Sequence, residues 1–140
     1  MAIPFPSDPW IKALKDQLNT SASYAETARN WEGDLLFQLD WPKAAQPPTL
    51  LYIDLWHGKC RAAYEVTGDH TLKPAFRLSA PIENWVKVLK GQWEPLQAMM
   101  TGKIKVQGNM VMMMKNVPTV LEFLRNCQQV ETVFPELKTG

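Results

Sequence analysis

The sequence predicts an α+β fold, with a five-stranded, mostly antiparallel sheet covered on one face by helices. Changes of hydrophobic period along the chain lead to this prediction. Apolar residues recur at helical spacing up to about residue 31, alternate with period two over 33–79, and return to helical spacing over 81–130 around one more alternating run. Consecutive strands that are flanked by helices in the sequence are typical of a sheet covered by helices on one face.

The 140 residues are most economically one domain, 1–140. We divide it into an N-terminal helical segment over 1–31, a β-meander over 33–79, and helices around a fifth strand over 81–130.

The first segment begins with a helix signal. Ser7 is a capping residue ahead of Pro9, which is suited to a first helical turn. Helical spacing then predicts a helix through about Asn19, and a weaker pattern predicts a second helix within 21–31. The apolar residues of the first helix are Trp10, Ile11, Leu14 and Leu18.

The central segment reads as an antiparallel meander. Its strands are expected at 35–41, 51–56, 60–67 and 73–79. Only three residues, His57, Gly58 and Lys59, separate the second and third strands, which is short enough for a tight turn. Pro74 indicates that the fourth strand begins late or lies at an edge.

After residue 80 the pattern alternates between helix and strand. We expect a helix over 82–89 ended by Gly91, a short helix before Gly102, a fifth strand over 103–107, and helices on both sides of a break at Pro118. The helical faces are Ile82, Trp85, Val86 and Leu89, then Leu96, Met99 and Met100, then Met110, Met113, Met114 and Val117, then Val120, Leu121 and Leu124.

Composition excludes several functions. Fifteen basic and fourteen acidic residues give a formal net charge of +1, which argues against nucleic-acid binding. The N-terminus does not resemble a signal peptide, and no window reaches the ~18 apolar residues of a membrane span. Cys60 and Cys127 lack the spacing of a disulfide or metal pair. We therefore expect a cytoplasmic protein.

No arrangement of residues indicates catalysis, and no metal or cofactor is predicted. Asp54 and Glu65 are expected to face each other across neighbouring strands, and His57 lies at a hairpin end. An enzyme that uses these groups ranks last among the hypotheses, because no nucleophile stands beside a base.

A family resemblance covers the later part of the chain. The segments that carry it are 76–79, Trp85, 91–95, 98–103 and 105–110, and the run from Gly102 to Asn109 is the most specific. In order and spacing they resemble the stand-alone form of the sterol carrier protein 2 (SCP-2) sterol-binding domain family, over about 31–130. The resemblance implies an SCP-2-like fold and a non-catalytic lipid carrier with an apolar cavity for a fatty acid, sterol, acyl-CoA or phospholipid. The chain ends in Leu137-Lys-Thr-Gly140 without a Ser-Lys-Leu type of address, so we do not expect peroxisomal targeting.

Methionine makes such a cavity plausible, because its polarizable, unbranched chain adapts to ligands of different shape. Trp85 and Trp93 flank the helical cover and are candidates to gate a cavity mouth. The expected ligand-binding residues are Trp85, Leu89, Trp93, Met99, Met100, Ile104, Val106, Met110, Met113, Met114, Val117, Leu121 and Leu124.

A core that is packed with side chains and has no cavity explains the same helical spacing of the apolar residues. The alternative function is therefore an accessory or dimerisation domain that docks on a second copy or a partner enzyme. A transient membrane-surface contact through Lys103 and Lys105 also stays open.

Overall fold

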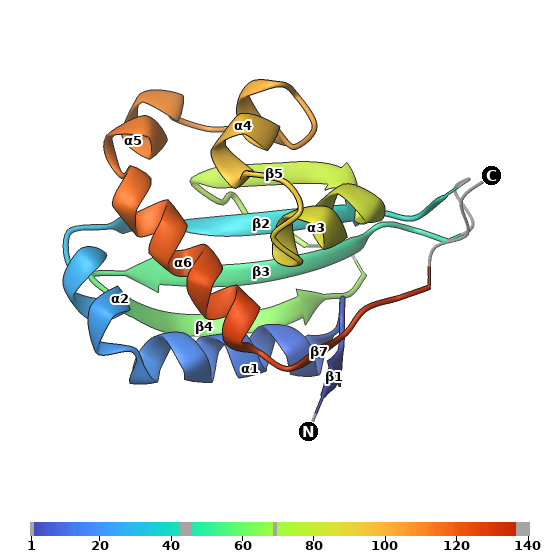
Figure 1. Cartoon of the computed structure of the whole chain (residues 1–140), viewed down its shortest axis with the longest axis horizontal. Coiled ribbons are helices and arrows are strands. Elements are labelled where there is room, and N and C mark those ends of the chain that lie inside the picture. Colours follow the sequence, from blue (N-terminus) through green and yellow to red (C-terminus); the bar gives the residue numbers. More distant parts are fainter. Residues whose placement is uncertain (1, 43–45, 69, 137–140) are drawn as a thin grey trace.

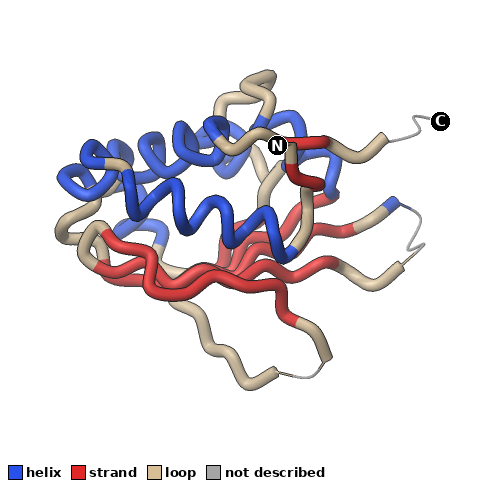
Figure 2. Tube along the Cα trace, turned by 90° about the horizontal axis from the view of Figure 1, so that it is seen from below, coloured by secondary structure: helices blue, strands red, loops and turns tan. Residues whose placement is uncertain are grey.

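The computed structural model describes residues 2–42, 46–68 and 70–136. The end of the chain on which the targeting expectation falls lies outside this range. Within it, a sheet of five strands is covered on one face by helices, as predicted (Figures 1 and 2). No helix in the described part is long and apolar enough to cross a membrane.

The N-terminal helices follow their sequence signals. Helix α1 spans Asp8–Thr20, and the Ser7 side chain caps it by accepting a hydrogen bond from the amide of Trp10 at 3.2 Å. Its apolar face is buried along strand β4 (Lys59–Val66; Figure 1). Helix α2 is shorter than expected, Ala22–Thr27, and is capped by Ser21.

The main sheet has the order β4-β3-β2-β5-β6. Its strands are β2 (Glu32–Asp40), β3 (Thr49–Trp56), β4 (Lys59–Val66), β5 (Phe76–Pro81) and β6 (Lys105–Gln107). His57 and Gly58 form the tight β3–β4 turn, both with positive φ, of 51° and 79°, so the predicted hairpin is confirmed.

The fourth expected strand does not continue the meander. Strand β5 starts at Phe76, after Pro74, and pairs with β2 in parallel instead of with β4. The chain reaches it by crossing the face of the sheet that the helices leave open (Figure 2). The amide of Ala75 donates to Asp34 Oδ1 at 2.7 Å where the crossover ends. A parallel neighbour requires such a crossover, which alternation alone does not reveal.

The cover is completed by the C-terminal helices. These are α3 (Ile82–Leu89), α4 (Pro95–Met100), α5 (Met110–Lys115) and α6 (Val117–Gln129). The break at Pro118 is confirmed, because α5 ends before Asn116 and Pro118 occupies the first turn of α6. Helix α6 lies across the sheet between α1 and the short helices (Figure 1).

The two ends of the described chain meet. Strands β1 (Ile3–Pro4) and β7 (Thr132–Val133) pair in parallel, which the sequence did not predict. The indole of Trp10 donates to Thr132 Oγ1 at 2.9 Å, and Phe5 packs edge-on against Trp10. This contact closes the end of the core where α1 begins.

Candidate ligand-binding site

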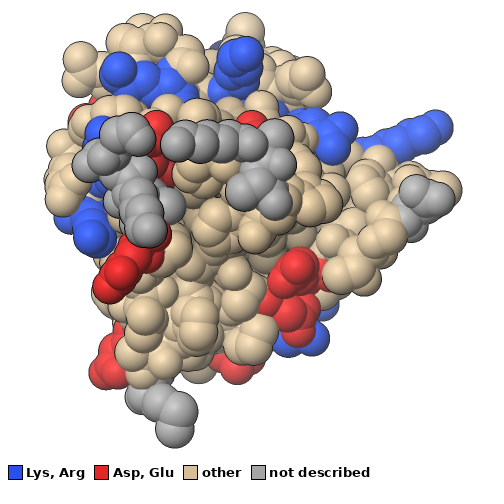
Figure 3. All heavy atoms as spheres, turned by 90° about the vertical axis from the view of Figure 1, so that its right-hand side faces the viewer, with Lys and Arg blue, Asp and Glu red and all other residues tan. Residues whose placement is uncertain are grey.

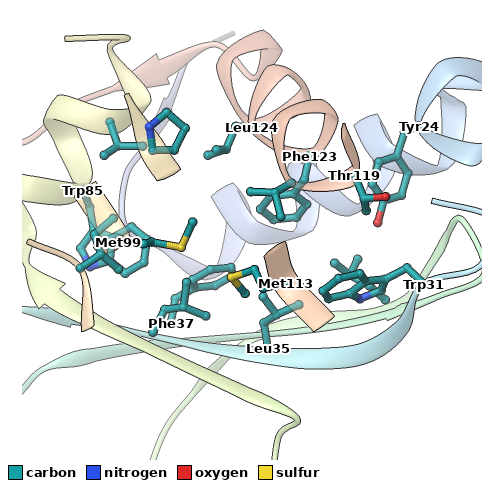
Figure 4. A pocket seen from close by; sticks show the side chains of 16 residues that line it. Tyr24, Trp31, Leu35, Phe37, Trp85, Met99, Met113, Thr119, Phe123 and Leu124 are labelled. Carbon is teal, nitrogen blue, oxygen red and sulfur yellow. The ribbon is translucent and has the colours of Figure 1, made fainter. Parts of the chain in front are cut away.

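An apolar cavity of about 70 Å³ lies between the sheet and the helical cover. Residues from β2, β3 and β5 form its floor, and residues from α2 to α6 form its walls and roof (Figure 4). Its lining residues are Tyr24, Trp31, Leu35, Phe37, Leu55, Leu78, Trp85, Val88, Pro95, Met99, Ile104, Met113, Thr119, Val120, Phe123 and Leu124.

Strand alternation explains the floor. Leu35 and Phe37 are two residues apart on β2, so both side chains point to the helices. Leu78 of β5 is the direct neighbour of Phe37 across the parallel pairing. The floor is therefore built from consecutive inward positions on adjacent strands.

The lining residues of the first cavity differ in how deeply they are buried. Phe37, Met99, Phe123 and Leu124 belong to the lining yet are half-buried, whereas Leu35 and Met113 are buried. The lining is therefore least covered at β2, α4 and α6.

The indole and threonine donors of the lining are already engaged. The indole of Trp31 donates to the carbonyl of Gly33 at 2.9 Å, and that of Trp85 donates to the carbonyl of Gln38 at 3.2 Å. The hydroxyl of Thr119 donates to the carbonyl of Thr27 at 3.1 Å. These donors fix the walls and leave an apolar surface toward the cavity.

A second apolar cavity, of about 50 Å³, continues toward the β1–β7 end. It shares Phe37, Trp85 and Phe123 with the first, together with Val88 and Leu124. Its further lining residues are Phe5, Trp10, Leu14, Leu39, Leu51, Leu89 and Cys127.

An aromatic partition separates the cavities. Phe37 meets Trp85 edge-on, with ring centroids 5.5 Å apart and planes at 89°, and stacks on Phe123 at 6.1 Å and 18°. We call Phe37, Trp85 and Phe123 the aromatic partition. A cavity of about 150 Å³ is known to hold benzene. Neither cavity therefore holds a long lipid as it stands, and a long ligand must displace part of the partition.

The predicted ligand-binding residues divide between cavity and surface. Trp85, Met99, Ile104, Met113 and Leu124 line the first cavity, and Leu89 lines the second. Met100 and Met114 point outward, with 70% and 43% of their surface exposed. Val106, Met110, Val117 and Leu121 are half-buried outside both linings. Whether the cavity-lining residues bind a ligand stays a prediction.

Trp93 does not gate either cavity. It lies beside a separate surface hollow of about 270 Å³. Its ring is covered by the ammonium groups of Lys87 and Lys103, 4.6 and 4.9 Å from the centroid. Of the two tryptophans considered as gates, Trp85 alone lines the described cavities.

The sequence interpretation missed the N-terminal wall and part of α6. It predicts only a weak helix within 21–31, where Tyr24 and Trp31 lie, and it does not single out Thr119 or Phe123 on the α6 face. The alternation of β2 did place Phe37 on one face with Leu35, which was the available signal. The identity of that face as the cavity floor depends on long-range packing.

The sequence and the fold match those of a known family. A model of the SCP-2 sterol transfer family matches residues 11–120. The chain belongs to this family. A search of curated protein sequences found no match.

Solved structures agree with this assignment. A crystal structure of sterol carrier protein 2 is 31% identical, with a TM-score of 0.80 over 89% of this chain and 97% of the other. A solution structure of TT1886 from Thermus thermophilus, described as possibly a sterol carrier protein, is 31% identical, with a TM-score of 0.79 over 89% and 88%. A UbiJ-SCP2 ubiquinone synthesis protein, 15% identical with a TM-score of 0.51 over 92% and 96%, shares the fold.

The polar candidates do not form a site in this SCP-2 family member. Asp54 lies opposite Ala62, and Glu65 lies opposite Leu51, so the expected pairing of the two carboxylates is wrong. Because the tight turn pairs Trp56 with Lys59, Glu65 lies too far along β4 to reach the position opposite Asp54. Asp54 instead accepts two hydrogen bonds from Arg61, at 3.0 and 3.1 Å.

His57 also lies apart from the cavity, against Glu32 at 2.6 Å on the surface. No group of three or more His, Cys, Asp or Glu side chains in residues 2–42, 46–68 and 70–136 is placed to hold a metal ion. Cys60 and Cys127 are buried free thiols, and burial raises the pKa of Cys60 to about 12. Neither thiol has the lowered pKa of a reactive cysteine.

Proposed function

We propose that this SCP-2 family protein is a non-catalytic carrier that binds one long apolar molecule, such as a sterol or a fatty-acyl lipid, between its sheet and α6. The observation that carries the proposal is an apolar cavity between the sheet and the helices, with a second apolar cavity behind the aromatic partition. Family membership gives the coarser statement that this is a lipid-carrier fold.

Burial of the acyl chain supplies the free energy of binding. A fully buried hexadecyl chain gains on the order of 10 kcal/mol at ~0.8 kcal/mol per methylene. The free-energy costs of association and of opening the aromatic partition offset part of this gain, so we expect an affinity near the micromolar range. Met99 and Met113, from different helices, let the wall adjust to more than one ligand shape.

A transient contact with a membrane surface supports loading and release. Lys87 and Lys103 flank Trp93, and the ammonium of Lys90 lies 5.1 Å from the ring centroid of Phe134. Basic side chains gather toward the top of the face in Figure 3, mostly above the acidic ones. Such a surface attracts anionic headgroups. The cytoplasmic location expected from the sequence stays a prediction.

Docking on a partner protein is the second candidate. Met100 of α4 and Val111 and Met114 of α5 are exposed apolar side chains on the short helices. The UbiJ-SCP2 structure carries a name that links it to ubiquinone synthesis, but its likeness concerns the fold alone.

Native mass spectrometry of the purified protein tests the carrier proposal, with solvent extraction of bound lipid and titration with a fluorescent fatty acid, a fluorescent sterol and a fluorescent acyl alcohol. Co-purified lipid or saturable one-to-one uptake of any probe is the expected result. A folded protein that is empty and takes up none of them would contradict the proposal and direct attention to the exposed face of α4 and α5.

A further inference from the structure

The short helices α4 and α5 expose apolar side chains at one end of the molecule. These side chains are Met100, Val111 and Met114, with 70%, 64% and 43% of their surface exposed. We call the three residues the apolar tip. Both helices lie at the top of Figure 1, and both border the first cavity, α4 through Met99 and α5 through Met113. Apolar side chains gathered on one exposed surface mark an interaction site.

The part of the chain that contains these helices is basic. Between Glu83 and Glu122 there are five lysines and one glutamate, which leaves ten of the fifteen basic and thirteen of the fourteen acidic residues for the rest of the chain. The formal net charge of +1 therefore combines a basic end with an acidic remainder. In Figure 3 the basic side chains gather toward the top, the end at which α4 and α5 lie in Figure 1.

The lysines near the apolar tip are available to a partner. Lys103, Lys105 and Lys115 are exposed, and none of them forms an ion pair within residues 2–42, 46–68 and 70–136. The glutamate of this segment, Glu94, is engaged at the start of α4, where its carboxylate accepts hydrogen bonds from two amides of that helix at 3.1 and 2.6 Å. The surface therefore joins exposed apolar groups to cations that no described carboxylate pairs with.

This combination fits an anionic bilayer better than a protein. Protein interfaces favour Trp, Tyr and Arg and are poor in lysine. Here Lys115 directly follows Met114, and Lys103 comes shortly after α4 along the chain. Each lysine near an anionic bilayer raises the affinity roughly fivefold, and flexible apolar side chains are accepted beneath the headgroups.

Helix α1 does not offer such a surface. Its apolar face is buried along β4, so it has no apolar side to insert. Its two lysines, Lys12 and Lys15, are balanced by Asp8 and Asp16, and Lys12 is paired with Asp8 at 2.6 Å. The exposed apolar and basic groups thus lie together on α4 and α5 and not on the longest N-terminal helix.

Contact through the apolar tip would bring the cavity wall to the bilayer. The lining residues Met99 and Met113 directly precede Met100 and Met114. Each of these six-residue helices fully buries one residue, Ala98 in α4 and Met113 in α5. Elements with so little buried surface open most easily. The outer side of α4 and α5 can therefore meet the bilayer while the inner side borders the cavity.

We propose that α4 and α5 dock this protein on anionic bilayers, with the apolar tip inserted beneath the headgroups and Lys103, Lys105 and Lys115 set against the phosphates. This inference rests on the proposed carrier function and deepens it, because it names the surface and the class of lipid through which the carrier is loaded. Vesicle binding is measured without a cavity ligand, so the docking surface and the carrier function can fail separately.

Flotation of the full chain with unilamellar vesicles tests the proposal. Vesicles of phosphatidylcholine are compared with vesicles that contain about 30% phosphatidylserine. We expect at least about tenfold stronger binding to the anionic vesicles, with release as the salt concentration rises. Equal binding to both compositions, or binding to neither, would refute the proposal. Binding to neither would leave a partner protein as the occupant of the apolar tip.

The variant Met100→Glu places a repelled charge in the apolar tip. We expect at least about tenfold weaker binding to the anionic vesicles. The control is Tyr64→Glu, which makes the same change of net charge at a residue with 36% of its surface exposed on β4, the edge of the sheet opposite β6. It should lose no more than about twofold, because the charge is far from the bilayer. Equal losses in the two variants would refute the assignment to α4 and α5.

The lysines are tested without disturbing the apolar tip. Lys115→Gln should weaken binding about fivefold, whereas Lys59→Gln, an exposed position at the β3–β4 turn, should bind like the wild type. This pair and the wild-type comparison decide the matter even if Met100→Glu does not fold. Equal binding by the two lysine variants would contradict the proposal.

Cavity loading is followed separately with a fluorescent fatty acid or sterol. Presented from cyclodextrin, the probe should bind Met100→Glu as tightly as the wild type; presented in anionic vesicles, it should reach the variant about tenfold more slowly. Equal transfer rates would refute the role of the docking surface in loading. If the wild type binds anionic vesicles as expected but takes up no probe, the carrier function fails and the docking surface stands.

Discussion

Replacement of Phe37 by alanine should join the two cavities. Phe37 is the member of the aromatic partition that touches both others, and its ring lies between the two linings. The substitution removes that ring from the central strand β2 without altering the backbone. A single continuous cavity should result.

The stability loss follows from burial and contact. A buried Phe→Ala change costs about 3–5 kcal/mol. Phe37 is half-buried and already borders empty space on both sides, so we expect the lower end, about 3 kcal/mol. For a protein of this size that lowers the melting temperature by about 10 °C.

The effect on binding has the opposite sign. A long ligand in the wild type must move the Phe37 ring away from Trp85 and Phe123, and each aromatic contact is worth about 0.5–1.5 kcal/mol. Alanine removes this opening cost of about 2 kcal/mol, a factor of about 30. Lost contacts between ring and ligand offset part of it. We therefore expect about tenfold tighter binding of hexadecanol and little change for octanol, which is short enough to stay on one side.

Urea unfolding and fluorescence titration measure both effects. The control is Leu36→Ala, because Leu36 is fully buried, adjacent in the chain, and points to the opposite face of β2. It should lose similar stability with no change in binding. If Phe37→Ala binds hexadecanol no better than Leu36→Ala does, the partition is not a barrier to the ligand and the reasoning is wrong.

Further predictions concern the cavity wall, the hairpin and the first helix. Met113→Trp should fill the first cavity and weaken hexadecanol binding about tenfold, while circular dichroism stays that of the wild type; normal affinity would place the ligand elsewhere. Gly58→Ala should cost at least about 2 kcal/mol in urea unfolding, because φ is +79° and the new Cβ would stand 2.5 Å from the carbonyl oxygen of Ala25; a smaller loss would mean that the turn yields. A hydrogen bond from Lys12 lowers the pKa of Asp8 below 3.8. The stability that the Asp8 carboxylate contributes is therefore present above pH 3.8 and is lost as the pH falls through the folded-state pKa. Asp8→Asn should therefore be less stable at neutral pH and converge with the wild type in acid; a constant difference would exclude the carboxylate charge as the cause.

Local signals predicted most of the fold because each one acts over a few residues. The cap at Ser7, the turn at His57 and Gly58, and the restart at Pro118 are all set by short-range geometry. Strand alternation likewise assigned Leu35 and Phe37 to one face. These features need no knowledge of distant residues.

The pairing between distant segments was harder to predict from the sequence. Alternation places Leu78 on one face of β5, but it does not indicate that Phe37 is its neighbour in a parallel pairing. The wall residue Tyr24 is similar, because its helix is polar and its burial depends on α6 packing over α2. The cavity is formed by such long-range contacts, so its outline was only partly predictable.

The methionines illustrate the same limit within one helix. Met110, Met113, Met114 and Val117 have the spacing of one continuous face, yet α5 has only six residues and ends at Lys115. The chain changes direction at Asn116, so Val117 starts another helix and the face does not extend to it. A helix of this length turns fewer than two times and buries one narrow stripe. Met113 occupies that stripe and Met114 faces outward. The adaptable part of the cavity wall is therefore one side chain from each short helix, Met113 from α5 and Met99 from α4, and substitutions at the neighbouring methionines should leave ligand selectivity unchanged.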